Sequence, residues 1–172
     1  KSWSMVQLAH ELARQCGKAT IDEVPLVPVL MYGHRLARML QERDEDAELD
    51  ASVIIQYMAR EYGAADQTRG EWLLMLTQAL QMHTLVILLD GMDEAAGRKD
   101  ALSKLVREIL CIDGFRLVVT TRPEGLDMDL FTSTFTVLSL EPLREEEQRV
   151  AAEKQLKQFP VGMAFSSHLT AF

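Results

Sequence analysis

The sequence contains little cysteine, and the two cysteines that it has do not make a covalent framework. Cys16 and Cys111 are the only ones in 172 residues. Their separation matches no metal-binding spacing, and a single pair is not the disulfide framework of a small secreted domain. Each falls on the apolar side of an expected helix, where a cysteine usually serves as a small buried hydrophobe. The composition therefore favours a reducing compartment, and we expect a cytoplasmic protein.

The chain also lacks long apolar runs and an excess of positive charge. No stretch approaches the roughly 20 apolar residues of a membrane-spanning helix, so we expect no membrane span. The formal net charge of −8 argues against a general binder of nucleic acid or of anionic membranes. It still allows a local basic pocket for phosphates. No internal repeat, low-complexity tract or signal peptide is visible, and the length suffices for one domain with a sizeable core.

The most informative feature is an apolar run that ends in acids. Residues 85–89 are five consecutive apolar residues, which is the pattern of a strand buried on both faces. The sequence Asp-Gly-Met-Asp-Glu follows directly at residues 90–94. Because ligands bind outside the carboxyl ends of parallel strands, such a tip is suited to holding hydrated Mg²⁺ beside a nucleoside triphosphate. The alternative is a core strand that ends in an ordinary acidic turn.

A second apolar segment ends in an arginine. Residues 115–120, Phe-Arg-Leu-Val-Val-Thr, are typical of another buried strand, and Pro123 stops regular structure just after Arg122. An arginine at the carboxyl end of a strand beside the acidic one could contact a γ-phosphate. The alternative is a surface arginine that pairs with a neighbouring acid.

Periodicity predicts the other elements. The strand pattern at residues 24–31 contains two prolines, which place it at or near a sheet edge because proline cannot donate to the ladder. Residues 135–140 alternate enough to form a last strand. The acid-rich run at 42–50 indicates a solvated loop or helix face, and residues 159–172 an irregular tail. Helical spacing of apolar residues predicts helices at 3–16, 34–41, 51–62, 71–82, 100–110 and 144–158.

The chain begins with Lys1-Ser2 in front of the first expected helix. Taken alone, this pair is best explained as a solvated N-terminus. Together with the acidic strand tip, it matches the last two residues of the phosphate-binding loop Gly-x-x-x-x-Gly-Lys-[Ser/Thr]. In that loop the lysine reaches the β- and γ-phosphates, the hydroxyl binds Mg²⁺, and the positive end of the helix faces the phosphates. The glycines are absent, so we expect a fragment of a longer polypeptide, cut just before the lysine.

These segments together resemble the NACHT-type NTPases of the STAND class, the nucleotide switches of NOD-like receptors. Residues 85–94 closely resemble the extended Walker B motif of that family, and residues 117–123, Leu-Val-Val-Thr-Thr-Arg-Pro, resemble its sensor-1 strand. Weaker similarity relates Lys1–Trp3 to the end of Walker A, residues 24–31 to the second strand, and residues 138–148 to the last strand and its following helix. The resemblance covers most of the chain.

The resemblance implies an α/β fold of the P-loop NTPase type over residues 1–158, with a parallel sheet that is flanked by helices and lacks its first, central strand. It also implies a slow ATPase whose nucleotide state, ATP or ADP with Mg²⁺, controls homo-oligomerisation in a signalling switch. The strand that leads into the phosphate loop would precede Lys1, so the sensor-1 strand and the last strand would each miss a neighbour. We therefore expect the chain alone to be poorly stable, inactive and hardly able to bind nucleotide.

The resemblance further implies a role for each site residue. Ser2 and Asp90 would bind Mg²⁺, Asp90 through water. Asp93 and Glu94 would position or activate the attacking water, and Arg122 would sense the γ-phosphate. The residues that would hold the nucleotide and its metal ion are Lys1, Ser2, Asp90 and Arg122.

Two other functions remain open. The first is a non-catalytic scaffold that keeps the sheet and has lost nucleotide chemistry; a degraded loop before Lys1 would indicate it. The second is an AAA-type ATPase subunit that acts on a macromolecule. That function would need an arginine finger that projects toward a neighbouring subunit, and no segment of the sequence marks itself as one.

Overall fold

The computed structural model describes the chain at residues 2–19, 24–43, 49–63, 69–95, 97–123 and 131–158. The chain divides into two compact units, Lys1–Phe135 and Thr136–Phe172. None of the helices in these described ranges has the length and apolarity needed to cross a lipid bilayer.

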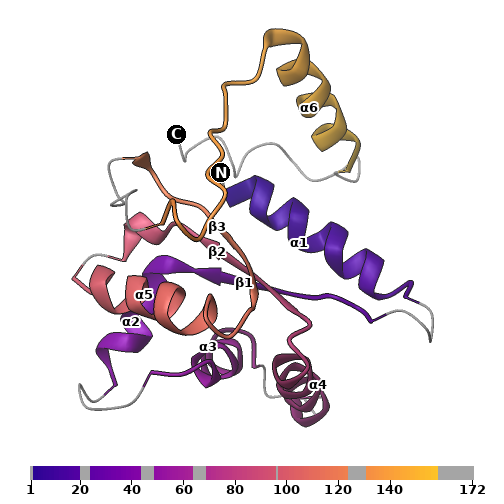
Figure 1. Cartoon of the computed structure of the whole chain (residues 1–172). Helices are drawn as coiled ribbons and strands as arrows, with labels where there is room; N and C mark the ends of the chain where they lie inside the picture. The colour runs from indigo at the N-terminus through magenta and orange to yellow at the C-terminus, as the bar shows by residue number, and fades with distance from the viewer. Residues whose placement is uncertain are drawn as a thin grey trace. The chain divides into compact units, whose positions relative to one another are not determined.

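A parallel sheet forms the centre of the first unit (Figure 1). In the part of the chain that the structure describes, it consists of β1 (Val27–Tyr32), β2 (Leu85–Asp90) and β3 (Arg116–Val119), in that order across the sheet. All six residues of β2 are buried, as the apolar run predicts. The proline-containing β1 lies at an edge of this sheet, which confirms the position that its prolines predict.

The side chains of β2 alternate between two hydrophobic cores, one on each face of the sheet. On one face Val86 and Leu88 pack with Met5 of α1 (Ser2–Cys16). Figure 1 shows α1 running opposite in direction to β1, so the first turn of α1 lies toward the end of the sheet where the strands terminate. The helices whose buried residues share the larger core on the other face are α2 (Gly33–Gln41), α3 (Ser52–Tyr62), α4 (Arg69–Gln81), α5 (Lys99–Lys104) and η2 (Leu105–Leu110). The first unit is therefore an α/β fold with a parallel sheet flanked by helices.

All six expected helices form, with ends that shift by a residue or two. The helix expected at 100–110 changes its hydrogen bonding halfway along. Its first half, α5, is α-helical, whereas η2 has the wider turns of a π-helix, and the N–H of Cys111 donates to the carbonyl of Val106 at 3.0 Å. Burial raises the pKa of the half-buried Cys111 thiol.

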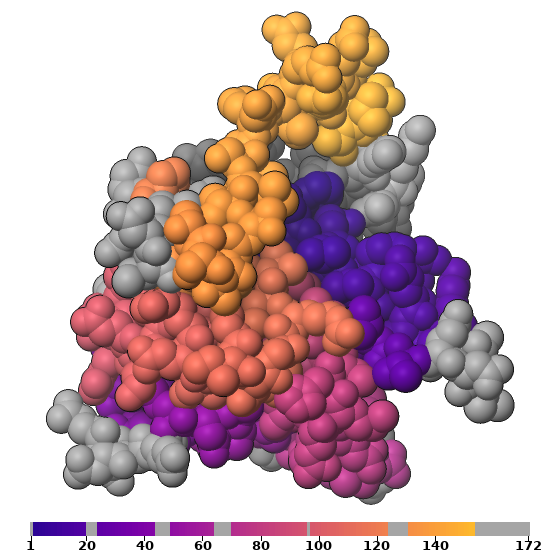
Figure 2. All heavy atoms as spheres, viewed as in Figure 1, coloured from indigo at the N-terminus to yellow at the C-terminus, as the bar shows by residue number. Residues whose placement is uncertain are grey.

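The end of α4 lies beside the start of β3. The ring of His83 stacks on Phe115 with centroids 4.9 Å apart, and the guanidinium of Arg116 donates to the His83 carbonyl at 2.9 Å. Figure 2 shows this part of the first unit as a continuous surface, on which side chains fill the space between the ribbons of α4 and of the segment from η2 to β3. These contacts hold the amino ends of β2 and β3 at the opposite end of the sheet from the acidic turn.

Two strand predictions are wrong. The strand expected at 135–140 does not form: residues 136–140 have no regular structure, and Leu138 is 84% exposed. Alternating residues need a neighbouring strand that pairs with their backbone groups, which the pattern itself does not supply. The expected burial of β3 on both faces is also not observed, because Arg116 and Val118 are exposed. They project to the face of the sheet where the core under α1 is built from residues of β1 and β2.

The second unit contains the charged helix that the sequence predicts, α6 (Glu145–Gln158). Three glutamates occupy its first turn, where negative charge complements the helix dipole. The backbone N–H of Arg144 donates to the Glu147 carboxylate at 2.8 Å, which caps the helix start. The tail expected at 159–172 lies outside the described residues.

Candidate functional site

The three strands end at the same edge of the sheet. Tyr32, the last residue of β1, is level with Asp90, the last residue of β2. Val119 at the end of β3 is level with Leu89, which places Thr120 beside Asp90. The prediction that the acidic strand and the arginine-bearing strand lie side by side and end together is confirmed. Residues 32–34, 90–94 and 120–122 therefore meet in one cluster.

Asp90 is almost completely buried, with 4% of its surface exposed. The Thr120 hydroxyl donates to Asp90 Oδ1 at 2.5 Å and accepts the backbone N–H of Gly91 at 3.0 Å. In the backbone, the Thr120 N–H donates to the carbonyl of Leu89 and the Thr120 carbonyl accepts the N–H of Met92, both at 2.9 Å. Thr120 thus orients Asp90 and joins β3 to the acidic turn. The sequence pattern assigns Thr120 no role of its own; the signal that identifies it is its position directly after a strand parallel to β2.

The acidic turn folds tightly around Gly91. This residue has a φ of +72°, in the left-handed region that favours glycine. The N–H of Glu94 donates to the Gly91 carbonyl at 3.0 Å. The Glu94 side chain folds back over the turn and lies close to Gly91. A Cβ placed on Gly91 would be only 2.9 Å from Glu94 Cδ. The glycine of the Asp-Gly-Met-Asp-Glu pattern therefore permits both the turn and this position of the carboxylate.

The start of α2 presses against the same turn, backbone to backbone. A Cβ on Gly33 would overlap the carbonyl group of Gly91, so glycine is the residue that fits there. This approach brings His34 to the acidic turn, where its Nδ1 lies 3.3 Å from Glu94 Oε2. Both side chains are about half exposed. The sequence pattern assigns Gly33 and His34 no role in the site; the signal that identifies them is a Gly-His pair close to the end of a predicted strand.

Asp93 faces the other neighbouring strand. Its Oδ1 accepts the backbone N–H of Arg122 at 3.1 Å, and its Oδ2 lies 3.4 Å from Arg122 Nε. The Asp93 side chain is only 13% exposed, whereas that of Arg122 is 72% exposed. Arg122 thus lies beside the acids, as its place in the sequence predicts. Each of the two acids that follow Asp90 is in contact with a basic side chain from a different flanking strand end.

Of the two residues expected to bind phosphate from the first helix, the structure describes one. Ser2 is the exposed first residue of α1, and Lys1 lies outside the described residues. Among the described residues, Ser2 makes no hydrogen bond to the acidic turn. The structure therefore brings four of the six predicted site residues into one cluster: Asp90, Asp93, Glu94 and Arg122.

The carboxylates at this edge of the sheet are enough in number for a Mg²⁺ ion that is also bound by a nucleotide. Within the described ranges, no group of three or more His, Cys, Asp or Glu side chains is arranged to hold a metal ion. Mg²⁺ beside a triphosphate takes only one or two protein carboxylates, because water and phosphate oxygens complete its shell. Asp90 at a strand end, oriented by the Thr120 hydroxyl, fits that requirement.

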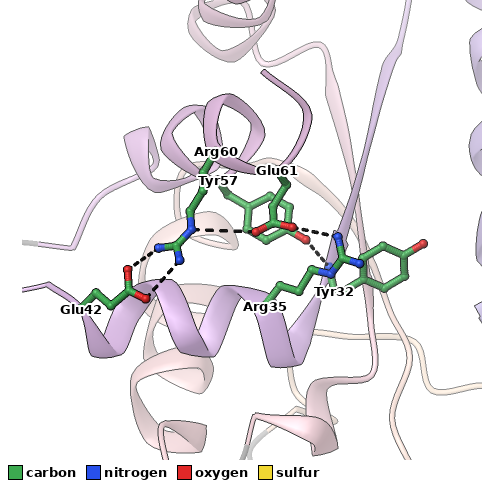
Figure 3. Close-up of polar contacts among 6 residues, drawn as sticks. All are labelled: Tyr32, Arg35, Glu42, Tyr57, Arg60 and Glu61. Atoms are coloured by element: carbon green, nitrogen blue, oxygen red, sulfur yellow. Dashed lines mark hydrogen bonds and ion pairs between the residues drawn. The ribbon is translucent and has the colours of Figure 1, made fainter. Parts of the chain in front are cut away.

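A polar network behind the site ties α2 to α3 (Figure 3). The hydroxyl of the fully buried Tyr57 accepts the backbone N–H of Tyr32 at 2.9 Å. Burial raises the pKa of Tyr57 to about 12. Arg35 of α2 pairs with Glu61 of α3 at 2.8 Å. Arg60 of α3 pairs with Glu42, the residue after α2, at 2.5 Å and with Glu61 at 3.9 Å. The end of β1 is thus held from the side of α3.

No protein-family model, curated protein or solved structure matches this chain. The observations that bear on function are the geometry of the strand ends and the sequence patterns that lead into them.

Proposed function

We propose that the chain is the ATP- and Mg²⁺-binding NTPase module of a STAND-type signalling switch of the NACHT kind, in which the nucleotide state controls oligomerisation. One observation carries the proposal: an acidic turn and an exposed arginine converge at the carboxyl ends of adjacent parallel strands. That edge is where open α/β sheets bind ligands. The parallel order of the three strands is compatible with a P-loop NTPase sheet.

In this proposal different residues would bind the metal ion and the phosphates of Mg-ATP. Asp90, oriented by Thr120, would hold the hydrated Mg²⁺. When bound, Mg²⁺ would neutralise negative charge on the phosphates. Lys1 and Ser2 would contact the phosphates and the metal ion from the start of α1, where the positive end of the helix dipole favours anions.

The acids and the arginine would act at the γ-phosphate. Glu94, whose side chain is 51% exposed, is the accessible carboxylate that would position or activate the attacking water. Arg122 would stabilise charge on the γ-phosphate, and its 72% exposed side chain leaves the guanidinium accessible to a ligand. Because ATP and ADP differ only in that phosphate, contacts to it supply the differential free energy that a two-state switch requires.

The test is substitution of Asp90 in the full-length protein. Asp90→Ala should reduce Mg²⁺-dependent ATP hydrolysis by more than about 100-fold. Asp113→Ala is the matched control, because Asp113 is an exposed aspartate in the turn before β3, at the opposite end of the sheet. Steady-state phosphate release measures both variants. Unchanged turnover in Asp90→Ala would overturn the assignment.

A non-catalytic scaffold is the second candidate, and one observation favours it. The acids of the cluster already have partners within the protein: Thr120 for Asp90, Arg122 for Asp93 and His34 for Glu94. Such a cluster can simply join three strand ends. Calorimetric titration of the full-length protein with Mg-ATP separates the two functions, because the scaffold would release no binding heat.

A further inference from the structure

We propose that Asp93 is a positioning residue, which holds Arg122 at the acidic turn and does not itself act on water. This inference rests on the proposed function, and it concerns how the same site distinguishes ATP from ADP. The sequence pattern assigns the positioning or activation of water to Asp93 and Glu94 together. Here Glu94 keeps that role and Asp93 holds Arg122.

Both oxygens of Asp93 face Arg122. Oδ1 accepts the Arg122 backbone N–H at 3.1 Å and Oδ2 lies 3.4 Å from the guanidinium Nε. With 13% of its side chain exposed, Asp93 offers little surface to a water molecule. Glu94 is more accessible than Asp93, because its side chain is 51% exposed. Its contact with His34, at 3.3 Å, involves one oxygen, Oε2. A group that removes a proton must reach it within hydrogen-bonding distance, and Glu94 meets that condition better.

Arg122 needs an anchor because it stands beyond the regular part of β3. The strand ends at Val119, and Thr120 still donates to the backbone of Leu89. The contact with Asp93 then fixes the backbone of Arg122 two residues further on. A long side chain such as arginine loses rotamer entropy when it binds a ligand. Because Asp93 already restrains the backbone and Nε of Arg122, fewer rotatable bonds lose their freedom when the guanidinium binds a γ-phosphate.

The two contacts can be separated by substitution. Asp93→Asn keeps an oxygen that can accept the Arg122 N–H and removes the charge. The guanidinium of this ion pair is 72% exposed, and a solvent-screened ion pair contributes about 1 kcal/mol, which corresponds to about fivefold. Asp93→Ala removes both contacts. A general base contributes about 10²- to 10⁴-fold to the rate, and asparagine cannot replace it.

The first experiment compares nucleotide affinities and hydrolysis in the full-length protein. We expect Asp93→Asn to keep kcat within about fivefold of the wild type. Asp93→Ala should lower the preference for ATP over ADP by about the same factor as Arg122→Ala, and the double variant should lower it no further, because coupled residues are not additive. Arg116→Ala is the matched control, an arginine at the amino end of the same strand whose guanidinium contacts the His83 carbonyl.

The second experiment needs no nucleotide. Hydrogen exchange at the Arg122 amide should speed up by at least about tenfold in Asp93→Ala, and less in Asp93→Asn, because the amide loses its acceptor. Unchanged exchange in Asp93→Ala would overturn the proposal. So would an Asp93→Asn variant that loses hydrolysis as fully as Asp93→Ala while retaining the preference for ATP. If the wild type binds no nucleotide, the proposed function fails, and the exchange rates alone decide whether Asp93 anchors Arg122.

Discussion

Gly33 and Gly91 set the distance between the start of α2 and the acidic turn. A Cβ on Gly33 would overlap the backbone carbonyl of Gly91, and no rotamer change can relieve that overlap. A Cβ on Gly91 would instead meet the Glu94 side chain, and the φ of +72° there favours glycine. The position of His34 beside Glu94 depends on the same approach. Two residues without side chains thus determine where the side chains of His34 and Glu94 meet.

A methyl group at Gly33 tests this arrangement. We expect Gly33→Ala to destabilise the fold by about 1–3 kcal/mol, the usual range for overpacking, because the methyl group meets the Gly91 carbonyl. Gly70→Ala in α4 is the control, since nothing lies within 4 Å of a Cβ there; it should stabilise the helix by about 0.4–1 kcal/mol. Urea denaturation measures both. A Gly33→Ala variant that is as stable as the Gly70→Ala variant would show that Gly33 is not in close contact.

Some residues of the site were predictable from the sequence, whereas others depend on which strands are neighbours. The acids at 90–94 and Arg122 follow apolar runs, so their places at strand ends were predictable from the chain. Thr120, Gly33 and His34 belong to common residue types in unremarkable positions, and their roles depend on which strand ends are neighbours. A single sequence does not state that pairing directly. Parallel register, once assumed, would have placed Thr120 beside Asp90.

At the scale of elements, α3 completes the outer edge of β1. An edge strand leaves backbone groups without a partner strand. Tyr57 accepts the N–H of Tyr32, and the Tyr62 hydroxyl donates to the carbonyl of Leu30 at 3.3 Å. These two strand residues share a parity, so both backbone groups point to the same side. Two tyrosines of one helix therefore take the place of a neighbouring strand beside the site.

Removal of the Tyr57 hydroxyl should weaken this edge and change its pH dependence. Tyr57→Phe leaves the Tyr32 N–H unpaired, which costs about 1–3 kcal/mol. Free tyrosine ionises near pH 10, whereas burial raises the pKa of Tyr57 to about 12. Stability from the neutral, buried hydroxyl is therefore complete below pH 10 and declines as the pH rises from 10 to 12. Urea midpoints between pH 9 and 12 should fall less steeply in Tyr57→Phe; identical slopes would contradict the assignment.

The strands show where pattern recognition succeeds and where it stops. Five consecutive apolar residues predict β2 correctly, because a short apolar run of this kind is typical of a strand covered on both faces. A similar run in β3 is covered well on one face only. The alternating segment at 136–140 has no strand pairing at all. Burial of a strand depends on its neighbours, so apolar composition predicts the tendency to form a strand and not its final environment.

At the scale of the whole molecule, charge makes Mg²⁺ necessary for the proposed ligand. The chain carries a net charge of −8, and the cluster itself contains three carboxylates against Arg122 and His34. A free triphosphate would approach a negative surface, which slows association and weakens binding. In the proposed function, Mg²⁺ would neutralise part of the charge of the ligand, and Asp90 would hold the ion. ATP alone and Mg-ATP should therefore affect the protein very differently.

Thermal unfolding of the full-length protein measures that difference. A ligand at 100 times its Kd stabilises the folded state by about 2.7 kcal/mol, which raises the Tm of a domain of this size by roughly 5–10 °C. We expect this shift with Mg-ATP and a much smaller one with ATP plus EDTA. Asp90→Asn keeps an oxygen for the Thr120 hydroxyl and should lose the Mg²⁺-dependent part of the shift. Equal shifts with and without Mg²⁺ in the wild type would mean that Asp90 has a structural role and binds no metal ion. A buried carboxylate held by Thr120 can stabilise the strand ends without a nucleotide.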